Sequence, residues 1–127
     1  MKTATTVARM LVRITGMINI ILGVLFWAHH ALTLIPVHIR VGYVLVLSLW
    51  VLAVLAARAG VNPAFAGLAI VWGFFVPILG FAHTRMAVGN AHWVLQVLHL
   101  LVGVGAIGLA EGLTVRIRQT RTPALQP

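Results

Sequence analysis

Long apolar runs alternate with short polar segments along this chain. Four runs can be drawn, at about residues 14–35, 41–57, 64–82 and 91–113. Each approaches the roughly 20 residues that an α-helix needs to cross the hydrocarbon layer of a bilayer. A backbone in lipid must satisfy its own hydrogen bonds, so each run is expected to be a helix, and the short connections make neighbouring helices antiparallel. The pattern therefore predicts an all-α, integral membrane four-helix bundle with up-down topology.

The composition agrees with a membrane location. Hydrophobic residues make up 61% of the chain and charged residues 8%, and Glu111 is the only acidic residue. A soluble domain carries roughly a quarter charged residues, so this chain has too few polar groups to cover a surface in water. The expected partner is the lipid bilayer. The net charge of +8 does not indicate nucleic-acid binding, because the basic residues lie between and beyond the apolar runs.

The basic residues predict an orientation. Seven of them fall on the side of the chain ends: Lys2, Arg9, Arg13, Arg58, Arg116, Arg118 and Arg121. Only Arg40 and Arg85 fall on the other side, so both termini are expected in the cytoplasm, with the protein in the bacterial inner membrane. Residues 1–13 are then a cytoplasmic segment before a retained first span, 14–113 the transmembrane domain, and 114–127 a basic cytoplasmic tail expected to be disordered.

All six histidines fall on the outer half of the predicted bundle. They are His29, His30, His38, His83, His92 and His99. On the fourth run, His92, Gln96, His99 and Gly103 share one helical face at i, i+4, i+7 and i+11. Polar residues in a membrane span usually face the bundle interior. A shared inward-facing imidazole site near the outer surface is therefore expected.

The first run offers a partner for His99. Gly16, Asn19, Gly23 and His30 form one stripe of small and polar residues, which is typical of a helix–helix contact in a membrane. The helical spacing of this stripe thus favours His30 as the partner of His99. A weak internal repeat, in which Val24–His29 resembles Ile78–His83, selects His29 instead, and the sequence leaves the choice between them open.

One ligand for two facing imidazoles is haem b, whose iron takes two axial histidines from different helices. His30 and His99 are the expected iron ligands. Basic groups near the outer surface would pair with the haem propionates. The complete set of candidate haem-binding residues is His29, His30, His38, His83, His92, His99, Arg40 and Arg85.

Other functions stay open. Three or four imidazoles could hold a divalent transition metal such as Cu(II), Zn(II) or Ni(II), and a metal or small-solute transporter would need such a site. The histidines could titrate with external pH, bind a quinone head group, or only hydrogen-bond within a non-catalytic membrane subunit or scaffold. The chain has no cysteine and no aspartate, which excludes thiolate sites and paired-carboxylate catalysis. An electron carrier or membrane subunit is thus favoured over an enzyme, and a homodimer sharing one site stays possible.

The stretch His38-Ile-Arg-Val-Gly42, followed by an apolar run to Arg58, resembles the second span of bacterial cytochrome b561-type proteins. The fourth run with His99 is similar in character, and the resemblance covers about a third of the chain. It implies a four-helix membrane protein with bis-histidine haem b that passes electrons from quinol, with a quinone or redox protein as partner. No histidine lies on the cytoplasmic half, so only one haem, near the outer face, is expected.

Two further side chains have structural roles in this reading. Glu111 lies near the cytoplasmic end of the fourth run and is expected to form a salt bridge with Arg13, Arg58 or Arg116. Asn19 is expected to hydrogen-bond to a neighbouring helix.

Overall fold

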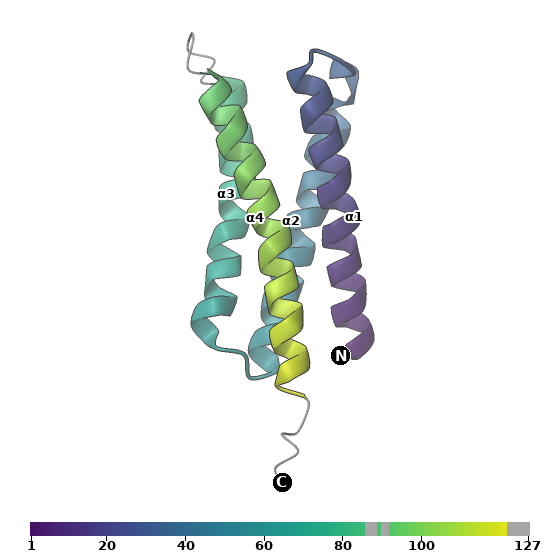
Figure 1. The fold of residues 1–127 in the computed structure, drawn as a ribbon, viewed down its shortest axis with the longest axis vertical. Coiled ribbons are helices and arrows are strands. Elements are labelled where there is room, and N and C mark those ends of the chain that lie inside the picture. The colour runs from purple at the N-terminus through teal and green to yellow at the C-terminus, as the bar shows by residue number, and fades with distance from the viewer. Residues whose placement is uncertain (86–88, 90–91, 122–127) are drawn as a thin grey trace.

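The computed structural model describes residues 1–85, 89 and 92–121 of the 127-residue chain, and it is an all-α bundle. Its elements are α1 (Lys2–Trp27), the short 3-10 turn η1 (Leu32–Leu34), α2 (Ile35–Arg58), α3 (Pro63–Arg85) and α4 (His92–Gln119). Figure 1 shows two hairpins, α1–α2 and α3–α4, side by side, with the start of α1 and the end of α4 at the same end of the bundle. Each of these four helices is long and apolar enough to cross a membrane. The predicted four-helix up-down bundle is confirmed.

The first helix lies further toward the N-terminus than predicted. The apolar run at 14–35 was expected to form it, whereas α1 spans Lys2–Trp27. Residues 1–13, expected to be a separate segment, supply almost half of this helix. The physical reason is packing. Ala8 and Val12 are buried in the core, so the helix continues toward the N-terminus past the basic residues of this segment.

The second helix begins earlier than its apolar run. Pro36 was expected to close the first helix, but it lies in the first turn of α2, which begins at Ile35. Proline is well tolerated there, because the amide protons of a first turn have no partner inside the helix. His38 and Arg40, expected in a loop, are consequently helical residues.

The third and fourth helices also extend beyond their predicted runs. The third, predicted at 64–82, continues to Arg85. The fourth, predicted to end at 113, continues to Gln119, so the first part of the expected disordered tail is helical. Residues 122–127 of that tail lie outside the described residues.

The ends of α1 and α2 use the same capping motif with different residues. At the end of α2, Gly60 has a φ of 82°, and the N–H of Val61 donates to the carbonyl of Ala56. At the end of α1, His29 has a φ of 58°, and the N–H of His30 donates to the carbonyl of Leu25. Both are Schellman motifs, whose left-handed residue is usually glycine. The motif ends α1 before either His29 or His30 can belong to it.

Each helix packs through a seam of inward positions spaced alternately by three and four residues. A spacing that averages about 3.5 residues is typical of helices that wrap around each other with a left-handed twist. The seam positions are Thr5, Ala8, Val12, Thr15, Asn19, Leu22 and Phe26 in α1; His38, Gly42, Leu45, Leu49, Leu52 and Ala56 in α2; Ala66, Ala69, Gly73, Val76 and Gly80 in α3; and His92, Gln96, His99, Gly103, Ala106, Ala110, Leu113 and Ile117 in α4. All are buried or half-buried.

The four seams do not meet symmetrically. α2 and α4 contact each other across the centre of the bundle, whereas no α1–α3 contact occurs among the residues that the structure describes. Small residues allow this diagonal contact, because Ala53 and Ala56 of α2 and Ala106 and Ala110 of α4 are fully buried. The arrangement brings the histidine-bearing helices α2 and α4 together.

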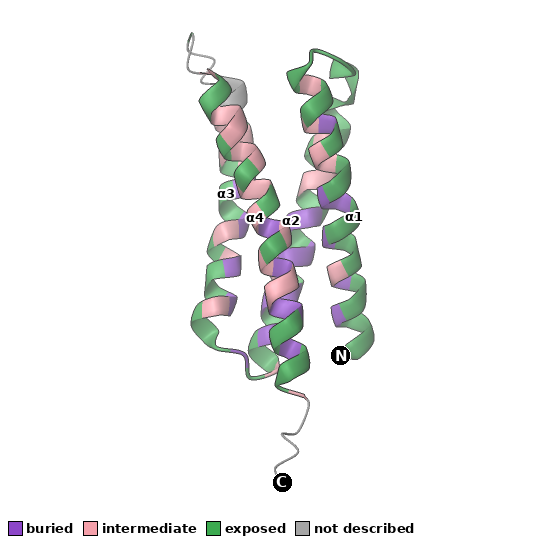
Figure 2. Ribbon diagram, viewed as in Figure 1, coloured by how far each residue is buried: buried purple, intermediate pink, exposed green. Residues whose placement is uncertain are grey.

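The tightly packed core occupies only one half of the bundle. Buried residues gather in the half nearer the chain ends, as Figure 2 shows. In the other half, none of the described residues within 23–44 and 77–105 is buried. The histidines therefore lie in the part of the bundle where the side chains are least enclosed by protein.

Tryptophan fixes the α2–α3 contact. The indole Nε1 of Trp50 donates to the carbonyl oxygen of Ile70 at 3.1 Å, and the ring lies directly against Gly73. A buried indole N–H usually needs such a partner, and glycine leaves room for the ring.

The α3–α4 contact repeats this arrangement one helix further on. Trp72 Nε1 donates to the carbonyl oxygen of Val102 at 2.9 Å, and a Cβ built on Gly105 would lie 2.5 Å from the indole ring. In both contacts the glycine follows the accepting residue by three positions, so the two face the same indole ring. These two tryptophans therefore join helices.

Candidate functional site at the histidine-bearing end

The structure separates the six histidines. His29 and His30 are exposed and lie beyond the end of α1, so the predicted iron ligand His30 is not on the inward stripe of that helix. Arg40 is exposed, and it cannot share a helical face with His38, which is only two positions away. His83 and Arg85 lie in the last turns of α3, and their side chains lie outside what the structure describes.

Two histidines meet across the bundle. The imidazole rings of His38, on α2, and His99, on α4, have centroids 6.1 Å apart with an interplanar angle of 56°. The His38 ring also lies against the Phe26 ring in a T-shaped arrangement, with a centroid distance of 5.4 Å and an interplanar angle of 67°. His99 packs against the backbone of α3, since a Cβ on Gly80 would lie 3.4 Å from His99 Cε1. Residues of all four helices thus surround this histidine pair.

The inward face predicted for α4 is confirmed. His92, Gln96, His99 and Gly103 are all half-buried, which is what an inward stripe in the less enclosed half of the bundle requires. Four of the residues between them are exposed on the outside of the helix, namely Trp93, Val94, Leu98 and Leu101, and the other four are half-buried.

Asn19 connects α1 to the first turns of α2. With the amide oriented to suit its backbone neighbours, Nδ2 donates to the His38 carbonyl oxygen at 3.0 Å and Oδ1 accepts from the Gly42 N–H at 3.1 Å. The same Nδ2 lies 3.3 Å from His38 Nδ1. The predicted interhelical hydrogen bonding of Asn19 is confirmed, and its partner is a histidine of the candidate site.

The orientation of Asn19 determines the tautomer of His38. Backbone groups have fixed polarity, so they set which side of the amide donates. An amide N–H that points at Nδ1 requires that nitrogen to accept, and a neutral imidazole then carries its proton on Nε2. In this arrangement His38 presents an N–H donor on its far side.

The sequence contained a signal that His38 faces inward, but the predicted helix boundaries concealed it. Leu45, Leu49 and Leu52 form a seam, and its spacing continues backward through Gly42 to His38. Because Pro36 was expected to end the first helix, His38 was expected in a loop, outside the register of this seam. The correction replaces His30 with His38 as the partner of His99.

A larger metal cluster is not found among the described residues. No group of three or more His, Cys, Asp or Glu side chains is placed to hold a metal ion within residues 1–82, 89 and 92–121. The site with three or four imidazoles that a divalent metal would favour is therefore not supported by this part of the chain.

The opposite end of the bundle carries charged contacts. Glu111 of α4 binds two arginines of α1: Arg9 Nη2 lies 2.7 Å from Oε2, and Arg13 Nε lies 2.6 Å from Oε1. The predicted salt bridge with Arg13 is confirmed, and Arg9 is a second partner that the sequence analysis missed. Arg9 lies four residues before Arg13 on the same face of α1, in the part of this helix that precedes the predicted run at 14–35.

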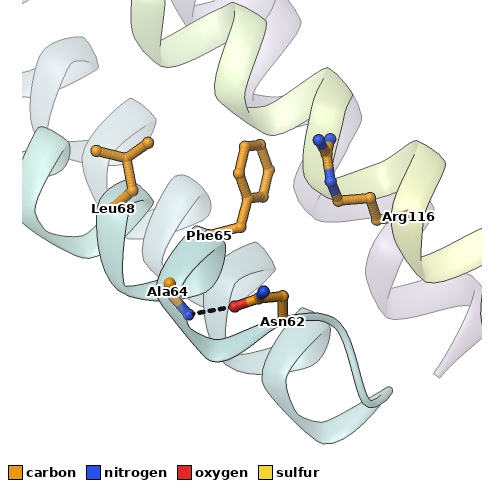
Figure 3. A pocket seen from close by; sticks show the side chains of 5 residues that line it. All are labelled: Asn62, Ala64, Phe65, Leu68 and Arg116. Atoms are coloured by element: carbon orange, nitrogen blue, oxygen red, sulfur yellow. Dashed lines mark hydrogen bonds between the residues drawn. The ribbon is translucent and has the colours of Figure 1, made fainter.

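A shallow apolar hollow lies near the α3–α4 contact. Figure 3 shows it between the start of α3 and the end of α4, with the Arg116 guanidinium over the Phe65 ring at 3.8 Å from the centroid. Asn62 caps α3 by accepting the N–H of Ala64 at 2.9 Å. The Arg116–Phe65 contact and the Asn62 cap stabilise the fold. The lining of the hollow carries no side chain suited to catalysis or to binding a metal.

Fold and site together define a four-helix bundle with spans suited to a membrane and a histidine pair in one half. No family model, curated protein or solved structure matches this chain. The function must therefore be argued from the site itself.

Proposed function

We propose that this chain is a small b-type haem protein of the membrane, with His38 and His99 as the axial ligands of one haem. The observation that carries the proposal is the approach of two imidazoles from separate helices to a centroid distance of 6.1 Å. Bis-histidine ligation needs two such rings and no carboxylate or thiolate, which suits a chain with one acidic residue and no cysteine.

The donor set fits the group. Two imidazole nitrogens that share one ion lie about 4 Å apart, because a metal–imidazole bond is about 2.0–2.1 Å. A centroid separation of 6.1 Å lies in the range that such sharing requires. Phe26 places an apolar ring beside the pair, and the glycines Gly42 and Gly80 leave the room that Asn19 and His99 occupy. When bound, haem supplies one-electron transfer, and the residues of this chain hold and orient it.

A second candidate has its own support. In a scaffold without a cofactor, His38 would serve only as a hydrogen-bonding link between helices. The Asn19 amide favours this reading, because it places the His38 proton on Nε2, the nitrogen that would otherwise bind iron. For ligation through Nε2, that proton must move to Nδ1 and the amide must rotate, since metal-bound histidines donate their other N–H to an acceptor.

An absorption spectrum separates the two candidates. The full chain is expressed with added haem precursor, purified in detergent and reduced with dithionite. The haem proposal predicts a Soret band with sharp α and β bands, which are lost in His38→Ala and His99→Ala and retained in the matched control His30→Ala. A colourless protein would overturn the proposal in favour of the scaffold, and loss of the bands in His30→Ala as well would overturn the assignment of His38 and His99 as the ligands. Metal analysis of the same sample tests the transporter alternative.

The proposed location is a bacterial inner membrane with both termini in the cytoplasm. Its support is the excess of basic residues at the end of the bundle that carries the chain ends. The histidine pair then lies nearer the outer surface, where a quinol in the membrane or an external redox protein could reach it. A C-terminal fusion to green fluorescent protein should be fluorescent, and one to alkaline phosphatase inactive; the reverse pattern would invert the orientation.

A further inference from the structure

A basic pocket lies at the other end of the bundle, between the start of α1 and the end of α4. Lys2, Arg118 and Arg121 contribute three positive charges to its lining, and Thr5 and Thr114 form part of its wall. Both threonines are buried, and their hydroxyls donate to backbone carbonyls of their own helices. The pocket is thus a built hollow with cationic groups at its rim.

No acidic side chain lines this pocket within the part of the chain that the structure describes. Glu111 is the only acidic residue of the chain, and it is bound by Arg9 and Arg13 one turn further into the bundle. Lys2 and Arg121 therefore meet no acidic side chain in the lining of the pocket. An anion is the ligand that such a lining attracts.

Arg121 gives an independent sign of a missing partner. Its Nη2 is buried, and it has no hydrogen-bond partner among the residues that the structure describes. Burying a guanidinium N–H without an acceptor is costly, so arginines in such positions normally hold a carboxylate or phosphate. The chain offers no carboxylate side chain for this purpose.

Exposed apolar side chains lie close to the pocket residues along both helices. Val7 and Met10 on α1 and Val115 on α4 are exposed, within two to three turns of the pocket. A ligand with a phosphate in the pocket could lay hydrocarbon chains against them. We infer that this pocket binds the phosphate of an anionic phospholipid, with Arg121 as its main hydrogen-bond donor. Basic pockets between membrane helices are known to suit such head groups.

Native mass spectrometry of the detergent-purified full chain tests the inference. Phosphatidylglycerol is titrated against phosphatidylcholine with the same acyl chains and against inorganic phosphate. Phosphatidylglycerol should bind tightest, and Arg121→Gln should weaken its binding about fivefold, as expected for one cation near a head group. Arg58→Gln is the matched control, because it removes one exposed charge at the same end outside the pocket, and it should change binding less than twofold.

Three results would overturn the inference. Equal weakening in Arg121→Gln and Arg58→Gln would show general surface charge instead of a pocket. Equal binding of both lipids would exclude recognition of an anionic head group, and inorganic phosphate that binds as tightly as the lipid would assign the site to a free anion. Thermal unfolding without added lipid shows whether the variants fold, and Lys2→Gln serves as a second pocket variant if Arg121→Gln does not.

Discussion

Arg9 and Glu111, 102 positions apart in the sequence, form a two-pronged ion pair across the α1–α4 contact. Arg9 Nη2 donates to Oε2 at 2.7 Å and Nε donates to Oε1 at 3.1 Å and to Oε2 at 3.0 Å, and the side chains are only 21% and 29% exposed. Bidentate pairs of this kind are the stronger class of charged hydrogen bond. The pair fixes the ends of the first and last helices side by side.

Glu111→Gln should therefore destabilise the bundle. The neutral amide leaves the Arg9 and Arg13 guanidiniums close together without a carboxylate between them. A double-mutant cycle with Arg9→Gln should give a coupling of about 1–2 kcal/mol, measured by unfolding titration in mixed detergent micelles. A coupling near zero would contradict the structural role of the pair. Arg58→Gln, which removes an exposed charge, is the control and should cost little.

Asn19→Asp should show which role His38 has. The carboxylate replaces the donor that faces Nδ1 with an acceptor, so the ring proton should move to Nδ1 and expose the Nε2 lone pair. If His38 binds haem, transfer of haem to apomyoglobin should be about tenfold slower in this variant. Faster loss than from the unaltered protein would argue against ligation by His38. Asn62→Asp, at an exposed helix cap, should leave the transfer rate unchanged.

His29→Gly should stabilise the protein and leave any haem spectrum unchanged. His29 occupies the left-handed position of a Schellman motif with a φ of 58°, where glycine pays no steric penalty. The expected gain is about 1 kcal/mol in the free energy of unfolding. Gly60→Ala, at the same position of the α2 motif, should lose a similar amount. A loss of stability or of absorption bands in His29→Gly would show a role for the imidazole itself.

Gly105→Ala should weaken the α3–α4 contact, because its Cβ would collide with the hydrogen-bonded Trp72 ring. We expect a loss of about 1–3 kcal/mol in unfolding titrations, as for overpacking in a core. Gly108→Ala on the same helix is the control, since no atom lies within 4 Å of its built Cβ. It should be neutral or gain up to about 1 kcal/mol from helix propensity. Equal effects of the two substitutions would contradict the proposed contact.

Several features could be predicted because they depend on local sequence alone. Run length and composition suffice for the helices, since lipid leaves the backbone no other solution. The inward face of α4 followed from the spacing of His92, Gln96 and His99, and the Glu111–Arg13 pair from the scarcity of acidic residues. Each of these inferences uses neighbours within one helix or a choice among very few partners.

The site itself could not be fixed in this way. Two short segments decided it: His29 adopts a left-handed conformation that ends α1, and Pro36 opens α2 instead of closing α1. The pattern of apolar residues reveals neither the end of α1 before His29 nor the start of α2 at Ile35, just before Pro36, because loops and helix ends at a membrane surface can be as apolar as the spans. The partner of His99 therefore changed from His30 to His38.

Local sequence is enough to define a chain of four apolar helices, with its histidines gathered toward one end and most of its charge toward the other. The tertiary structure alone decided that α2 and α4 touch across the bundle centre, so that His38 meets His99 while Asn19 orients His38. The physical reason is that helix formation is governed by residues a few positions apart. Which faces meet depends on the sum of small packing differences, such as alanines at the diagonal and glycines beneath the tryptophans, across segments distant in sequence.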